Sequence, residues 1–143
     1  MKKIVFILTA VLSFVFATNS QNASQAEITF EKSTFDFGDI KQGQVVNAVF
    51  KFKNTGKEPL ILSNVSTTCG CTVPSWPKDP IAPGKSAEIS ATFNSAGKMG
   101  QQNKVITIFS NAKNGQAQVS IVCNVLPADA PATTPQNQTA PKN

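Results

Sequence analysis

The sequence predicts an all-β fold, an immunoglobulin-like β-sandwich of about seven strands that occupies residues 27–126. Apolar and polar residues alternate in short runs with the period of two that a half-buried strand requires. Gly, Pro, Asn and Asp separate these runs, and no stretch shows a helical period. About 100 residues with this pattern match the size of an immunoglobulin-like domain.

Each expected strand is an alternating run bounded by turn residues. The clearest is Val46–Lys53, in which Phe50 and Phe52 share an apolar face and lysines occupy the other face. We expect the phenylalanine face to point inward, because burying aromatic area is the main source of stability in a small core. The expected strands are, in chain order, residues 28–30, 35–37, 46–53, 60–68, 87–93, 105–109 and 116–125.

Three turns connect these strands with residues suited to tight backbone geometry. Residues 54–59 form the first turn, in which we expect Gly56 to take a positive φ. Pro83 and Gly84 suit the second and third positions of a type II turn. Asn114-Gly115 is a hairpin signal that joins the last two strands.

The two ends of the chain differ in composition from the sandwich. Two lysines precede the thirteen uncharged residues 4–16, a run too short to span a bilayer, which needs about 20. We therefore expect a signal peptide cleaved after Ala17, with Ser20 and Ala23 as alternative sites, and a short linker over residues 18–26. Residues 127–143 are rich in Pro, Ala, Thr, Asn and Gln, and we expect them to form a disordered tail.

Charge and composition exclude several classes of function. The chain has 13 lysines, 8 acidic residues and no arginine, histidine or tyrosine. Losing residues 1–17 leaves 11 lysines against 8 acidic residues, a net charge of +3. Without histidine there is no Ser-His-Asp or Cys-His pair, and lysines without arginine are a poor nucleic-acid footprint. We expect a protein that is not an enzyme, binds no nucleic acid and is not stably inserted in a membrane after signal cleavage.

Several motifs of the chain are typical of a known family. They are residues 35–40, 50–56, 67–74, 81–86 and 93–98, which include Cys-Gly-Cys and Ala-Pro-Gly-Lys. The first two motifs resemble the opening strands of the major-sperm-protein and cilia-associated class of immunoglobulin-like modules. All five together are similar to the secreted bacterial family called domain of unknown function 1573, common in Bacteroidetes. The resemblance implies a sandwich fold and a cell-envelope location, periplasmic or extracellular, and it implies no activity.

Cys69, Cys71 and Cys123 allow three interpretations. The favoured one is a structural disulfide from Cys123 to Cys69 or Cys71, because an oxidising compartment favours disulfides. We expect Cys123 to point inward by alternation, and the strands that end at residues 68 and 125 to run parallel in one sheet, which would place the cysteines at the same end of the fold. On an extended backbone, cysteines two apart have Cα atoms near the limit of about 7 Å, so a bond between Cys69 and Cys71 would be strained. Alternatively, three thiolates and Met99 could bind a soft ion such as copper(I). Third, the thiols could stay reduced or take part in redox exchange, with Lys78 lowering a thiol pKa.

Trp76, in a loop with three prolines, is the remaining candidate. It could be an interface anchor, although we favour an indole that caps the open end of the sandwich. The leading function is a non-enzymatic secreted or periplasmic module without a cofactor. It would either bind an unknown envelope or extracellular protein or contribute to envelope structure. The alternative is a copper-binding or thiol-redox protein that uses Cys69, Cys71 and Cys123.

The first prediction concerns processing. Protein isolated from its host should begin near Thr18, Gln21 or Ser24, because the apolar run 4–16 has the properties of a cleaved signal. Intact-mass spectrometry measures this. Retention of residues 1–16 in a membrane fraction would contradict it.

Overall fold

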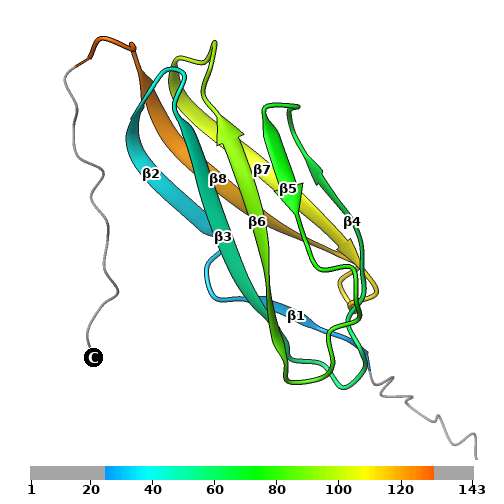
Figure 1. The fold of residues 1–143 in the computed structure, drawn as a ribbon. Coiled ribbons are helices and arrows are strands. Elements are labelled where there is room, and N and C mark those ends of the chain that lie inside the picture. Colours follow the sequence, from blue (N-terminus) through cyan, green and yellow to red (C-terminus); the bar gives the residue numbers. More distant parts are fainter. Residues whose placement is uncertain (1–24, 131–143) are drawn as a thin grey trace, which may run out of the picture.

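The computed structural model describes residues 25–130, which form two four-stranded β-sheets packed face to face (Figure 1). The sheets have the strand orders β1-β3-β6-β5 and β2-β8-β7-β4. This confirms the predicted sandwich. The strands are β1 (Ile28–Phe30), β2 (Thr34–Lys41), β3 (Val45–Asn54), β4 (Leu62–Thr67), β5 (Thr72–Ser75), β6 (Ser86–Asn94), β7 (Gly100–Ser110) and β8 (Gln116–Leu126).

The two predicted terminal segments fall mainly outside this range. The expected signal peptide, residues 18–24 of the expected linker and residues 131–143 of the expected tail lie outside the described residues. Within residues 25–130 there is no helix with the length and apolar character needed to cross a membrane.

The core is a single apolar layer between the two sheets. Alternate residues of β3 are buried, and Phe50 and Phe52 point inward as predicted. The central strands β6, β7 and β8 add their own alternate side chains, among them the fully buried Phe93 and Ile108. Because removing apolar area from water stabilises by about 25 cal/mol per Å², these four central strands supply most of the driving force for folding.

An eighth strand, β5, was not predicted. It has four residues and pairs with the far edge of β6, in the segment assigned from the sequence to a proline-rich loop. The chain leaves one sheet at the end of β4 and enters the other at β5, so these edge strands lie on the same side of the sandwich (Figure 1). The Cys-Gly-Cys motif therefore lies at a crossover between the sheets.

Two of the glycine predictions have different outcomes. Gly84 has a φ of 75°, and the Lys85 amide donates to the Ala82 carbonyl at 3.1 Å, which confirms the predicted turn. The prediction for Gly56 is wrong, because its φ is not positive. Gly56 is required for a different reason: a Cβ there would overlap the backbone of residues 25–27, which passes directly over it.

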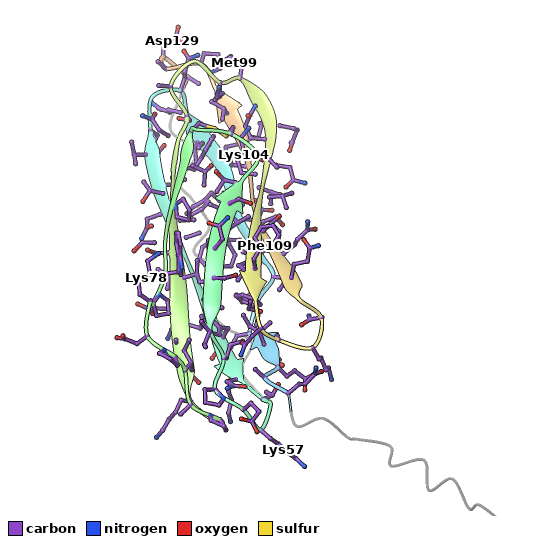
Figure 2. The ribbon with its side chains drawn as sticks, turned by 90° about the vertical axis from the view of Figure 1, so that its right-hand side faces the viewer. Lys57, Lys78, Met99, Lys104, Phe109 and Asp129 are labelled. Carbon is purple, nitrogen blue, oxygen red and sulfur yellow. A yellow bond between two sulfur atoms is a disulfide. The ribbon has the colours of Figure 1, made fainter. Side chains whose placement is uncertain are left out.

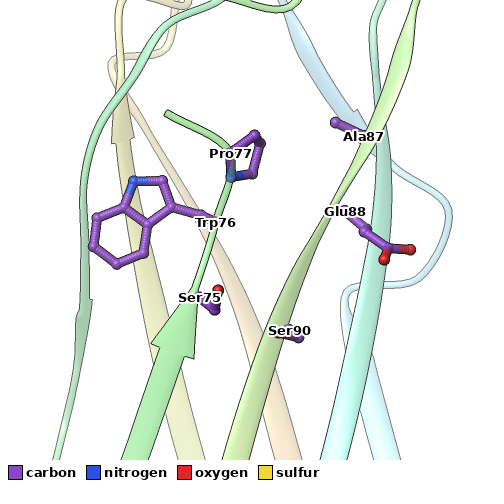
Figure 3. Close-up of a pocket in the computed structure, with 6 residues that line it drawn as sticks. All are labelled: Ser75, Trp76, Pro77, Ala87, Glu88 and Ser90. Atoms are coloured by element: carbon purple, nitrogen blue, oxygen red, sulfur yellow. The ribbon is translucent and has the colours of Figure 1, made fainter. Parts of the chain in front are cut away.

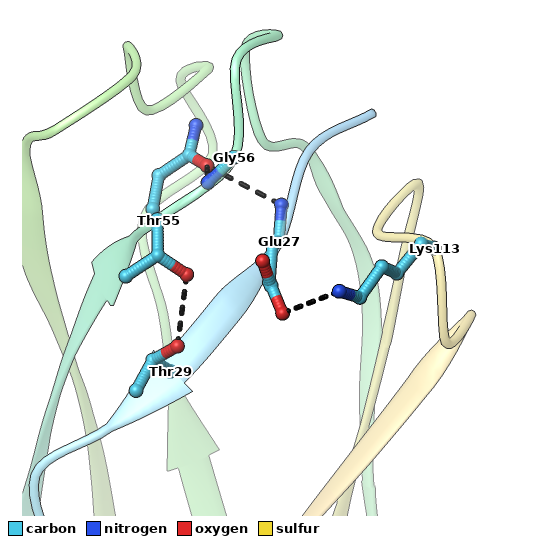
Figure 4. Close-up of polar contacts among 6 residues, drawn as sticks. Glu27, Thr29, Thr55, Gly56 and Lys113 are labelled. Atoms are coloured by element: carbon cyan, nitrogen blue, oxygen red, sulfur yellow. Dashed lines mark hydrogen bonds and ion pairs between the residues drawn. The ribbon is translucent and has the colours of Figure 1, made fainter. Parts of the chain in front are cut away.

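A buried amide, that of Asn54, joins three segments at this end of the sandwich. Its Nδ2 donates to the carbonyls of Glu58 at 2.8 Å and Ile81 at 2.9 Å. Its Oδ1 accepts from the amides of Gly56 at 3.0 Å and Glu27 at 3.4 Å (Figure 4). Asn54 is fully buried. If its side chain were removed, each group that it contacts would lose a hydrogen-bond partner that water could not replace.

Asn54→Asp should destabilise the domain by about 3 kcal/mol, since it removes two donors and sets a carboxylate against two carbonyl oxygens. Thermal unfolding measures the loss, expected at roughly 10 to 20 °C for a domain of this size. Asn47→Asp is the matched control on the same strand: Asn47 is exposed, and its Oδ1 accepts from Thr92, which a carboxylate also does. Equal effects of the two substitutions would contradict the role of Asn54.

Candidate functional site

The features that the sequence marks as candidates lie mostly on one short stretch of chain. Residues 69–78, here called the β5 segment, contain the Cys-Gly-Cys motif before β5 and Trp76 and Lys78 after it. The segment forms an open side of the sandwich, because β5 and its neighbour in space β4 are both edge strands. Met99 and Cys123 belong to other elements.

Cys69 and Cys71 are joined by a disulfide, contrary to the favoured prediction. The strain expected for this bond applies to an extended backbone, whereas residues 70 and 71 form a turn closed by a hydrogen bond from the Thr72 amide to the Cys69 carbonyl. The turn shortens the Cα–Cα separation to 5.3 Å, within the ordinary range for a disulfide.

The predicted bond from Cys123 is wrong, and the strand order explains why. β4, which ends just before Cys69, and β8, which carries Cys123, lie parallel in one sheet as expected, but β7 lies between them. Two strand spacings are about 10 Å, beyond the limit of about 7 Å for bridged Cα atoms. Cys123 is a free thiol, 2% exposed, that packs in the core as its alternation predicted. Burial raises the pKa of this thiol, partly offset by Lys104, and Asp36 raises it further.

The residues suggested as soft-metal ligands are not brought together as thiolates. Two of the three sulfurs are consumed in the disulfide, and Met99 is exposed at the end of the sandwich opposite Lys57 (Figure 2). Among residues 25–130 no group of three Cys, Asp or Glu side chains is placed to hold a metal ion.

The observed disulfide contributes less to stability than the expected one would have. In the chain-entropy model, a loop of three residues corresponds to about 1.6 kcal/mol, against roughly 4 kcal/mol for the loop of about 50 residues that a bond to Cys123 would close. The bond between Cys69 and Cys71 is therefore a weak constraint on the unfolded chain.

Trp76 packs against the core at the open side, directly after β5. It is partly buried, and the Lys78 ammonium lies 3.1 Å from the centre of its ring, a cation–π contact that holds the indole in place. Its Nε1 is buried and has no hydrogen-bond partner within the described part of the chain. The lysine considered as a modifier of a thiol pKa thus contacts the tryptophan instead.

The position of Pro74 suits an edge strand. The backbone N–H of Asn94 donates to the Cys71 carbonyl at 3.0 Å, so Cys71 and Asn94 form a hydrogen-bonded pair. In an antiparallel ladder every second pair of opposite residues is hydrogen-bonded in this way. Pro74, opposite Ala91, falls between these positions, so its missing N–H faces away from β6. A proline is tolerated there because no ladder bond is lost.

Pro77 ends the ladder. The last pair is Ser75 with Ser90, so Pro77 would come opposite Glu88 at a position that must supply an N–H donor. Proline has none, and the chain leaves β6 at this point. β6 itself continues to Ser86, so its first residues pair only with β3.

The backbone of Glu88 is left open by this arrangement. The backbone N–H of Asn54 donates to the Lys85 carbonyl at 2.9 Å. Every second residue of β6 from Lys85 onward therefore bonds to β3, and Ala87 is one of them. The N–H and C=O of Glu88 therefore point toward the side that β5 has left, and they have no backbone partner in the range 25–130.

A hollow of about 450 Å³ lies at this place (Figure 3). Figure 3 shows the Trp76 indole directed away from β6, with the Pro77 ring between the indole and β6. The residues that line the hollow are Ser75, Trp76, Pro77, Ala87, Glu88 and Ser90.

Sequence reasoning found Trp76 and the cysteines but missed β5 and the open edge of β6. The signal for β5 was present: Thr72 and Val73 are β-branched, and the spacing of Pro74 and Pro77 permits a ladder at the first and stops it at the second. The edge of β6 required knowledge of which strands are neighbours.

The sequence profile of one protein family, described as a protein of unknown function (DUF1573), matches residues 28–125. The chain belongs to the DUF1573 family. This confirms the resemblance given by its motifs. No curated protein matches the chain.

Solved structures support the fold of this DUF1573 domain. A protein of unknown function from Porphyromonas gingivalis W83 aligns with a TM-score of 0.63 at 18% identity, over 76% of this chain and 51% of the other. The ASH/PapD-like domain of human CEP192 aligns with a TM-score of 0.60 at 9% identity, over 74% of this chain and 89% of the other. The secreted serine protease VesC from Vibrio cholerae aligns with a TM-score of 0.54 at 16% identity, over 69% of this chain and 23% of the other. The chain thus spans about half of the Porphyromonas protein, and these similarities show the fold alone.

The buried thiol gives a testable outcome. Iodoacetamide should label Cys123 at least about 100-fold more slowly in the folded protein than in denaturant, because the thiolate is both inaccessible and disfavoured by burial. Alkylation followed by peptide mass spectrometry measures the rate. Rapid labelling under native conditions would show that Cys123 is not part of the core.

Proposed function

We propose that this DUF1573 domain is an exported, non-enzymatic binding module, periplasmic or extracellular, whose ligand is an extended segment of an envelope or extracellular protein. Export is supported by the apolar run 4–16 behind two lysines. The sequence contains no histidine, so it offers no Ser-His-Asp or Cys-His catalytic pair, and the proposal includes no resident cofactor.

The observation that carries the proposal is the open edge of β6 at Glu88. A strand edge with an unpaired N–H and C=O is the template on which a partner adds a strand. The two edge strands of the same sheet are poorer templates, since β1 has three residues and β5 has four with a proline among them. β6 belongs to the central part of its sheet, so an added segment would rest on a rigid support.

The hollow beside this edge provides side-chain recognition. Trp76 is among the residues that line the hollow, and the Lys78 ammonium lies against its ring. Ser75 and Ser90 are the last pair of the ladder and place hydroxyl side chains at one end. Main-chain pairing at Glu88 would supply affinity, and an apolar side chain against Trp76 would supply specificity.

Site-specific cross-linking tests where the partner binds. A photo-reactive amino acid at Ser75, which lines the hollow, should cross-link an envelope protein, whereas the same group at Gln118 on the other sheet should not. Mass spectrometry identifies the cross-linked segment, and a synthetic peptide of that segment is then titrated against the domain by calorimetry.

Two substitutions at one position test the mode of binding. Glu88→Pro should weaken peptide binding about ten-fold, because it removes the open N–H without affecting the ladder to β3. Glu88→Gln keeps the N–H and should bind like the wild type. The Glu88 amide should also exchange its hydrogen more slowly in the complex. Equal binding by both variants, or cross-links only from Gln118, would contradict the proposal.

A further inference from the structure

The disulfide between Cys69 and Cys71 is accessible from solvent. Both residues are partly exposed, and Cys71 also packs against the core. Gly70 between them is exposed, with no atom within 4 Å of where a Cβ would be, so the chain leaves open space beside the disulfide. Accessible disulfides are the ones that take part in exchange, whereas buried ones resist it.

The turn around the disulfide is held by hydrogen bonds that do not involve sulfur. The Thr67 hydroxyl donates to the carbonyls of Cys69 at 2.9 Å and Thr72 at 3.2 Å. The Asn94 amide donates to the Cys71 carbonyl at 3.0 Å, which ties the second cysteine to β6. Breaking the S–S bond therefore leaves two thiols held in the geometry from which the bond forms again.

The two sulfurs differ in their surroundings. The Thr72 hydroxyl lies 3.9 Å from Sγ of Cys69, and in the disulfide it can only be the donor. A donated hydrogen bond favours the charged form of a thiol, so Cys69 is the better leaving group. The third cysteine, Cys123, is buried and does not compete.

We propose that Cys69 and Cys71 form a reversible redox site that exchanges with dithiols. A thiolate of the dithiol attacks Sγ of Cys71, forms a mixed disulfide and releases Cys69 as a thiolate. The second thiol of the dithiol then attacks the dithiol's first sulfur, which is bonded to Sγ of Cys71 in the mixed disulfide, and Cys71 is released as a thiolate. The dithiol is oxidised by two electrons to its cyclic disulfide, and the two electrons and two protons end on Cys69 and Cys71.

Reduction of the purified protein with dithiothreitol tests the site. Alkylation and mass spectrometry should show two new thiols, at Cys69 and Cys71, while the circular dichroism spectrum and cooperative unfolding are retained and Cys123 stays unlabelled. Removal of dithiothreitol in the presence of oxidised glutathione should restore the bond. A disulfide that is reduced only when the domain unfolds would overturn the proposal.

The direction of exchange has its own test. In Cys71→Ser, the remaining Cys69 thiol should react with iodoacetamide at lower pH than the Cys71 thiol does in Cys69→Ser. In the otherwise wild-type protein, Thr72→Val should slow reduction by dithiothreitol about three-fold or more, since it removes the donor at the leaving sulfur. Thr107→Val, on β7, is the matched control and should leave the rate unchanged. A more acidic Cys71, or equal rates in Thr72→Val and the wild type, would overturn the assigned direction.

Discussion

The layer of apolar side chains between β3–β6 and β7–β8 is the constraint on which the rest of the molecule depends. Each of these strands must present every second residue to that layer, so a shift of one residue would expose a complete face. Phe50, Phe93 and Ile108 are fully buried because the strand pairs β3–β6 and β7–β8 keep their registers over nine and ten positions. The edge strands are free to be short because the central strands already form the core.

That freedom explains why the candidate sites are at an edge. β5 covers only part of β6, and the rest of β6 stays open without a loss of core packing. The same edge holds a turn that carries the disulfide at one end of β5 and Trp76 at the other. Two features with different chemistry, the disulfide and the open edge of β6 beside Trp76, thus lie at the two ends of the four-residue strand β5.

Buried polar groups define the ends of the sandwich. Asn54 uses both donors and its acceptor to connect the approach to β1, the turn after β3 and the loop before β6. At the opposite end, the hydroxyl of buried Ser95 donates toward the carbonyls of Lys41 and Gln44, both at 2.8 Å. Their specific partners allow loops to turn tightly over the core without leaving carbonyl groups unsatisfied.

The sequence by itself determined the sandwich, the inward faces of its main strands, the turn at Gly84 and the burial of Cys123. These are local properties, because alternation and turn chemistry depend on neighbours in the chain. The tertiary structure decided the pairing of the cysteines, the role of Gly56 and the open edge at Glu88. Each depends on which segments are adjacent in space: β7 separates Cys123 from the other cysteines, residues 25–27 pass over Gly56, and Pro77 matters only because β6 lies beside it. Such neighbours are set by the packing of the whole domain.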